Sequence, residues 1–130
     1  MSQNFTHIIE TICERDLRYK EDAYDFVMEA LSFTQRKFHR SKHVTGEEFL
    51  SGIRDLLMDR FGPLTLSVLH HWGIKSTEDI GNIVFNLVEN KVLSKTDEDK
   101  VESFRNGYDF REVFDSGYRK LLEKKISRMR

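Results

Sequence analysis

A short segment between two predicted helices gathers side chains that could hold a charged ligand. Residues 36–43 read RKFHRSKH and contain no carboxylate but four cations: Arg36, Lys37, Arg40 and Lys42. Lysine and arginine attract phosphates by charge alone, so this segment is a candidate contact for nucleic acid or for an acidic partner. The alternative is a solvated loop that joins two helices and binds nothing.

A second basic cluster occupies residues 118–130, which read YRKLLEKKISRMR. Six Lys or Arg side chains accompany a single carboxylate, Glu123, while Leu121, Leu122 and Ile126 fall on one side of a helix. Cations near the C-terminus of a helix complement its dipole, and this is the interpretation we favour. The alternatives are a phosphate contact that works together with the first cluster, or a helix that lies on a membrane surface.

The histidines have spacings that could suit a metal ion. His39 and His43 stand four residues apart, Glu47 follows four residues later, and His70 adjoins His71. Side chains four apart share a face only inside a helix, whereas the residues after His39 resemble a loop that ends in a helix cap. No HExxH motif accompanies them, so we predict no metal site and no cofactor.

The carboxylates and the single cysteine form no recognisable catalytic set. Most acidic residues fall in predicted first turns of helices, where they complement the helix dipole, or in the turn TDED at 96–99. Cys13 lies beside the apolar stripe of the first predicted helix, which favours a buried, unreactive thiol. The sequence also lacks GxGxxG and P-loop motifs. We therefore predict that the protein is not an enzyme and has no catalytic or nucleotide-binding residues.

Composition bounds the class of protein. The chain has 130 residues, of which 38% are hydrophobic and 33% charged, and this suits one folded domain. Its net charge of −1 argues against a surface devoted to nucleic acid or anionic lipid. The first residues lack the pattern of a signal peptide, and no apolar run is long enough to span a membrane. We therefore expect a cytoplasmic protein.

Apolar residues recur at helical spacing along most of the chain. A capping box at Thr45 and Glu48 begins one predicted helix, Gly62 ends it, and Gly73 ends the next. The predicted helices span residues 4–16, 22–38, 45–61, 63–72, 77–91 and 109–125. Residues 92–104 read either as a short β-hairpin or as a capped helical turn.

The same periodicity assigns side chains to the core or to the surface. In the second predicted helix, Tyr24 lies off the apolar stripe and is expected outside the core. The last predicted helix is expected to bury Phe110, Val113, Phe114, Leu121 and Leu122.

These elements predict a single compact domain that is mainly α-helical, with six or seven helices. Its parts are an N-terminal helical region (residues 1–43), a centre (44–104) and a C-terminal helix with a basic tail (105–130). In the centre, the order of helix, tight turn, helix and hairpin is that of a winged helix. We therefore expect a winged-helix-like helix-turn-helix, followed by a short β-hairpin if residues 92–104 do not form a helical turn.

Five motifs cover most of residues 19–114: YDFVMEAL, VTGEEFLSGIRDL, FGPLTLSVLHHWGI, TEDIGNIVFNLVE and LSKTDED. Together they resemble a family of short, uncharacterised bacterial proteins of similar length. The resemblance implies a bacterial origin, and it implies no activity, ligand or site residue. Separately, IVFNLVENKVLSKTDED is similar to the recognition helix and wing of winged-helix regulators.

The predicted helix at 77–91 distinguishes the two leading functions. It has no Lys or Arg before its final residue, whereas a helix that reads DNA usually presents such side chains to the bases. Off its core stripe it displays Phe85 and three asparagines, Asn82, Asn86 and Asn90. Phe85 is either an exposed anchor for a partner or a residue that packs on the terminal helix.

The sequence therefore predicts a non-enzymatic interaction module whose partner is another protein. The alternative is nucleic-acid binding through residues 36–43 and the C-terminal tail, and an enzyme is a remote alternative. The candidate contact residues for either partner are Arg36, Lys37, Arg40, Lys42 and Phe85.

Overall fold

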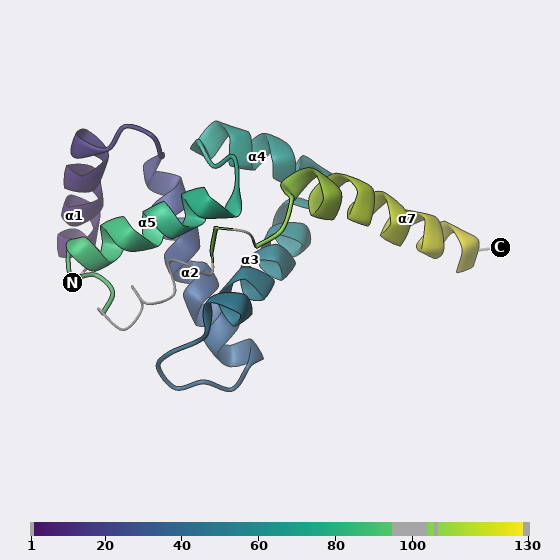
Figure 1. Ribbon diagram of the computed structural model, residues 1–130, viewed down its shortest axis with the longest axis horizontal. Helices are drawn as coiled ribbons and strands as arrows, with labels where there is room; N and C mark the ends of the chain where they lie inside the picture. The colour runs from purple at the N-terminus through teal and green to yellow at the C-terminus, as the bar shows by residue number, and fades with distance from the viewer. Residues whose placement is uncertain (1, 95–103, 106, 129–130) are drawn as a thin grey trace.

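Helices make up the regular structure of the computed structural model, which describes residues 2–94, 104–105 and 107–128 (Figure 1). No β-strand occurs within these ranges. A 3₁₀ turn, η1 (Gly62–Leu64), precedes α4, and a π-helical segment, η3 (Arg111–Ser116), precedes α7. The predicted mainly α-helical fold is confirmed. The α-helices are α1 (Ser2–Arg15), α2 (Glu21–Lys37), α3 (Gly46–Phe61), α4 (Thr65–Trp72), α5 (Thr77–Glu89) and α7 (Gly117–Arg128).

Local signals place the turns between helices where the sequence predicts them. The Thr45 hydroxyl accepts from the Glu48 amide at 3.0 Å, and the Glu48 carboxylate accepts from the Thr45 amide at 2.9 Å. Gly62 and Gly73 adopt positive φ values of 47° and 87°, which favour glycine at helix ends. A Cβ at Gly73 would also lie 2.0 Å from the carbonyl oxygen of Arg18. The end of α4 therefore lies directly against the connection between α1 and α2.

Helices α2 and α3 approach so closely that one position on α3 requires glycine. A Cβ at Gly52 would lie 1.9 Å from the hydroxyl oxygen of Thr34. Thr34 is fully buried, and its hydroxyl donates to the carbonyl oxygen of Ala30 at 2.7 Å. The hydroxyl is thus satisfied within α2, and the bare backbone of Gly52 packs against it.

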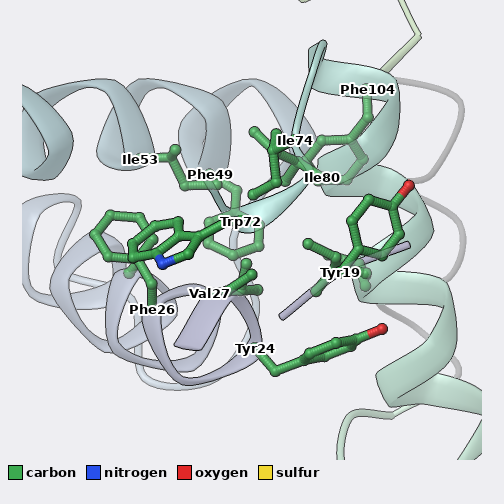
Figure 2. Close-up of a cluster of buried hydrophobic side chains, with 14 of the residues drawn as sticks. Tyr19, Tyr24, Phe26, Val27, Phe49, Ile53, Trp72, Ile74, Ile80 and Phe104 are labelled. Carbon is green, nitrogen blue, oxygen red and sulfur yellow. The ribbon is translucent and has the colours of Figure 1, made fainter. Parts of the chain in front are cut away.

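Aromatic and branched aliphatic side chains from α2, α3, α4 and α5 fill the core (Figure 2). The rings of Phe26 and Trp72 lie 5.2 Å apart, and Phe61 completes this group at 6.3 Å from Phe26 and 5.8 Å from Trp72. The predicted apolar stripe of α5 is confirmed by four residues that are almost completely buried: Ile80, Ile83, Val84 and Leu87.

The chain that follows α5 returns to the core through Phe104 and Tyr108. Phe104 is fully buried, and its ring meets Phe49 edge-on at 6.0 Å. Its carbonyl oxygen accepts from the Thr77 hydroxyl at 2.5 Å, while the Tyr108 hydroxyl donates to the carbonyl oxygen of Leu50 at 2.8 Å. These contacts fix the start of the C-terminal helical region, after which α7 extends away from the body of the protein (Figure 1).

The structure corrects two predicted side-chain placements. Tyr24 is predicted outside the core, but its side chain is fully buried, because a phenol can fill apolar space and still place its hydroxyl on a polar partner. Leu122 is predicted to be buried but is 44% exposed, because α7 has left the body. Phe110 and Phe114 are buried as predicted, and the side chain of Leu121 lies outside the described part of the structure.

The predicted β-hairpin at residues 92–104 falls largely on residues 95–103, which lie outside the described ranges. The described neighbours, residues 92–94 and Phe104, are not in a strand. The winged-helix-like arrangement therefore stays a prediction.

Replacing Leu87 with alanine tests the packing of α5. Leu87 is fully buried, so Leu87→Ala is expected to lower the free energy of unfolding by about 2–5 kcal/mol. Leu17→Ala is the matched control, because Leu17 is 85% exposed and its loss should stay below about 0.5 kcal/mol. Urea unfolding of the three proteins measures both values. Equally small losses in both variants would show that α5 is not packed as described.

Candidate functional site

A row of polar side chains on α5 faces the connection between α1 and α2, and we call Asp79, Asn82 and Asn86 the polar row. At its first end, the Tyr19 hydroxyl donates to the Asp79 carboxylate at 2.5 Å and accepts from the Asn82 amide at 3.0 Å. The Asp79 carboxylate also accepts from the backbone amide of Ser76 at 3.2 Å, which makes it part of the capping box of α5. Tyr19 thereby joins the first turn of α5 to the start of α2.

The second end of the polar row is built around Asn86. Its side-chain amide donates to the Tyr24 hydroxyl at 2.9 Å and to the Asp16 carboxylate at 3.0 Å. Asp16 also accepts two hydrogen bonds from the Arg18 guanidinium, at 2.9 and 2.7 Å. The same asparagine thus satisfies a buried phenol and orients an ion pair at the edge of the core.

These bonds explain the acid–base behaviour of the groups that make them. The Arg18 guanidinium and the Asn86 amide hold the pKa of Asp16 well below its usual range. Burial raises the pKa of Tyr19, and it raises the pKa of Tyr24 to about 12. Each shift moves the group away from neutral pH, where a general acid or base works best. The polar row is therefore suited to hold helices together rather than to move protons.

The polar row reduces the number of side chains on α5 that are available to a partner. Asn82 and Asn86 lie off the apolar stripe, as the sequence predicts, but their amides are already bonded within the protein. Asn90 donates to the carbonyl oxygen of Asn86 at 2.8 Å. Phe85 is the remaining candidate contact on α5, and it is 40% exposed. Sequence reasoning missed the role of the asparagines, although their spacing beside an apolar stripe was a usable signal.

Two of the four candidate cations at residues 36–43 are paired with carboxylates of α3. Lys37 forms an ion pair with Asp55, and Arg40 forms one with Glu48 at 3.0 Å. These ion pairs connect the turn between α2 and α3 to α3 itself, and they neutralise two of the four cations in the predicted contact. The other two candidate cations are exposed: Arg36 and Lys42.

Cys13 and the histidines have no arrangement typical of a reactive or metal centre. The Cys13 thiol is partly buried, with its sulfur 3.6 Å from the carbonyl oxygen of Tyr19. Burial, together with the charge of Glu21, raises the pKa of this thiol and so favours its protonated, unreactive form. Among the residues that the structure describes, no three His, Cys, Asp or Glu side chains gather as a metal site would require.

A cleft of about 330 Å³ opens beside the start of α5, and its hydroxyl groups serve packing. The Thr77 hydroxyl donates to the carbonyl oxygen of Phe104 and accepts from the Gly107 amide at 3.2 Å. The Tyr108 hydroxyl, on another wall, donates to a backbone carbonyl of α3. These two hydroxyls therefore hold the chain at Phe104, Gly107 and Tyr108 against α5 and α3.

Helix α7 presents a basic and apolar face to solvent. All of its side chains that the structure describes are exposed. Leu122 and Ile126 are 44% and 50% exposed, and they stand four residues apart, which places them on one face. At 100° per residue, Arg119 and Lys125 flank this pair on its two sides, and Arg119 also forms an ion pair with Asp115 at 3.1 Å. We call these four residues the α7 face; its signal in the sequence was an apolar stripe surrounded by cations.

No protein-family model, no curated protein and no solved structure matches this chain. The resemblance to a bacterial family therefore remains a prediction from the motifs. Within the described part of the chain, no helix combines the length and the apolar character that crossing a membrane requires.

Replacing Asn86 with alanine tests the polar row. The Tyr24 hydroxyl would stay buried without its partner, so Asn86→Ala is expected to cost about 1–3 kcal/mol of unfolding free energy. Asn90→Ala is the control, because Asn90 bonds only within its own helix end, and its cost should be near or below about 0.5 kcal/mol. The double variant with Tyr24→Phe should lose less than the two single losses combined. Strict additivity would refute the coupling.

Chelation tests the absence of a structural metal. Among the described residues, no three metal-ligating side chains lie close enough together to bind an ion, so EDTA is expected to leave the melting temperature unchanged. The measurement is a thermal melt followed by circular dichroism, with and without the chelator. A fall in melting temperature that zinc reverses would restore a metal role for His39, His43 and the pair at 70–71.

Proposed function

We propose that the protein acts by binding another protein and that the α7 face carries the contact. The exposure of Leu122 and Ile126 supports this most strongly, because both belong to a helix that projects into solvent (Figure 1). Apolar side chains gathered on one face of an exposed helix are characteristic of a surface that a partner covers. We therefore place the proposed contact on α7 rather than on Phe85 of α5.

Binding to nucleic acid has less support in the arrangement of charges. The turn at residues 36–43 has lost two of its four cations to ion pairs with α3. It lies at the lower edge of Figure 1, whereas α7 extends to the right, so the two basic clusters do not form one surface. Helix α5 adds no cation, and two of its asparagine amides are committed internally.

Binding also has more support than catalysis. The side chains with the largest pKa shifts are engaged in the polar row, and their shifts lead away from neutral pH. The hydroxyls that line the cleft at α5 bond to the backbone. These groups are engaged in helix packing, and this supports a binding role over catalysis.

We include the winged-helix-like centre in this proposal. We propose that α3, α4 and α5 form the helical part of a winged-helix-like centre, and the order of these helices supports this likeness of architecture. The bacterial origin rests on the sequence motifs, and the cytoplasmic location stays a prediction as well.

A pull-down from the native host with a paired-variant design tests this function. Wild-type protein is expected to retain a protein partner in lysates with and without nuclease, and Leu122→Asp combined with Ile126→Asp should lose it. Both residues are exposed, so the variant should keep the wild-type melting temperature.

Phe85→Ser is the matched control on α5 and should retain the partner. Loss of the partner in Phe85→Ser alone would return the contact to α5. Loss of all binding after nuclease treatment would favour the nucleic-acid alternative.

A further inference from the structure

The α7 face has a chemically complementary surface on α1 and α2. Residues 10–25 carry six carboxylates and three cations, so this surface is net negative. No exposed carboxylate here forms an ion pair with a residue that the structure describes. We call these exposed carboxylates the acidic face: Glu10, Glu14, Glu21, Asp22 and Asp25.

Helical spacing groups these carboxylates in two sets, because Glu10 and Glu14 stand four residues apart on α1 and Glu21 and Asp25 stand four apart on α2. Cys13 lies on α1 next to Glu14, and burial, with the charges of Glu21 and Asp25 on α2, raises the pKa of its thiol. Burial and the charge of Asp22 raise the pKa of Asp25. The end of α1 and the start of α2 therefore bring like charges together, and a cationic partner would relieve their repulsion.

An exposed apolar side chain accompanies the acidic face. Leu17 lies in the connection between α1 and α2, and it is 85% exposed. Protein interfaces combine apolar side chains with charged ones, and the α7 face makes the same combination with the opposite charge. The helices also match in length, because α7 has 12 residues and α1 has 14, or about 18 and 21 Å at 1.5 Å per residue.

We infer from this complementarity that the α7 face of one copy docks on the acidic face of a second copy. This inference rests on the proposed function and names its partner. In Figure 1, α1 lies at one end of the longest axis and α7 projects from the other end, so one copy does not close the contact on itself. A head-to-tail contact of this kind leaves both faces available at the ends of an assembly, which then grows as an open series or closes as a ring.

Other occupants of the α7 face match fewer of these features. Two α7 helices facing each other would oppose the five cations of residues 119–128 on each copy, with only Glu123 to offset them. An anionic membrane would satisfy the cations of α7 but would leave the acidic face and Leu17 uncovered. A contact made by one short helix is small, so the association should be weak and should fall with salt.

Complementary variants test the inference in a single mixing experiment. The α7 variant carries Leu122→Asp and Ile126→Asp and retains its acidic face. The acidic-face variant carries Glu10→Lys and Glu14→Lys and retains its α7 face. Sedimentation velocity at increasing concentration should show wild-type protein growing beyond a dimer, and each variant alone should stay monomeric. An equimolar mixture of the variants should form a heterodimer and nothing larger, because only one pair of intact faces remains.

Three outcomes would overturn the inference. They are self-association by the acidic-face variant alone, a mixture that stays monomeric, and wild-type protein that stays monomeric at every concentration. Circular dichroism melts confirm that both variants are folded, and Lys125→Ser replaces the α7 variant if that protein does not fold. Wild-type protein that is monomeric yet pulls down another protein through α7 would refute self-association and leave the proposed function standing. Cosedimentation of such a monomer with phosphatidylserine vesicles would assign the α7 face to lipid.

Discussion

The arrangement of this protein depends on the two-sided packing of α5. One side carries an apolar stripe that is almost completely buried, and the adjoining side carries the polar row, which bonds to the connection between α1 and α2. At its first turn, Thr77 and Gly81 meet the returning chain at Phe104, where a Cβ on Gly81 would lie 3.0 Å from the Phe104 Cβ. Because α5 is engaged on so many sides, it has little surface left for a partner.

We therefore propose that a partner contacts the two ends of the molecule instead. Helix α7 leaves the body after the contacts at Phe104 and Tyr108, and it carries exposed leucine and isoleucine side chains between cations. The α1–α2 end carries the exposed carboxylates of the acidic face and the exposed side chain of Leu17. Although the net charge of the whole chain is small, the two ends of the molecule carry charge of opposite sign. Such separation of charge favours a defined orientation on encounter more than it adds affinity.

Local chemistry was predictable from the sequence, and long-range chemistry was not. The capping box at Thr45 and the positive φ values at Gly62 and Gly73 follow from neighbouring residues, so short motifs suffice to find them. Tyr24 was misplaced because its partner, Asn86, stands 62 residues away, and helical periodicity carries no information about such a contact. The pairing of Lys37 with Asp55 was hidden for the same reason.

The exposure of Leu122 on α7 was also not predictable from the neighbouring residues. An apolar stripe predicts that a helix buries Leu122, but burial also needs a surface to pack against, and α7 extends beyond the body. The sequence therefore identified an amphipathic basic helix and could not tell whether this chain or a partner covers it. Leu122 is exposed because the contacts of Phe104 and Tyr108 with the core set the point at which α7 leaves the body of the protein.

Hydrogen exchange of the α7 backbone amides at low and high protein concentration tests the central claim most directly. An exposed helix of 12 residues is marginal on its own, so its amides should exchange rapidly in dilute protein, while those of α5 exchange slowly. At high concentration the α7 amides should become protected, and α5 should be unchanged. Strong protection of α7 in dilute protein would contradict the account, because it would mean that this chain already covers the helix itself.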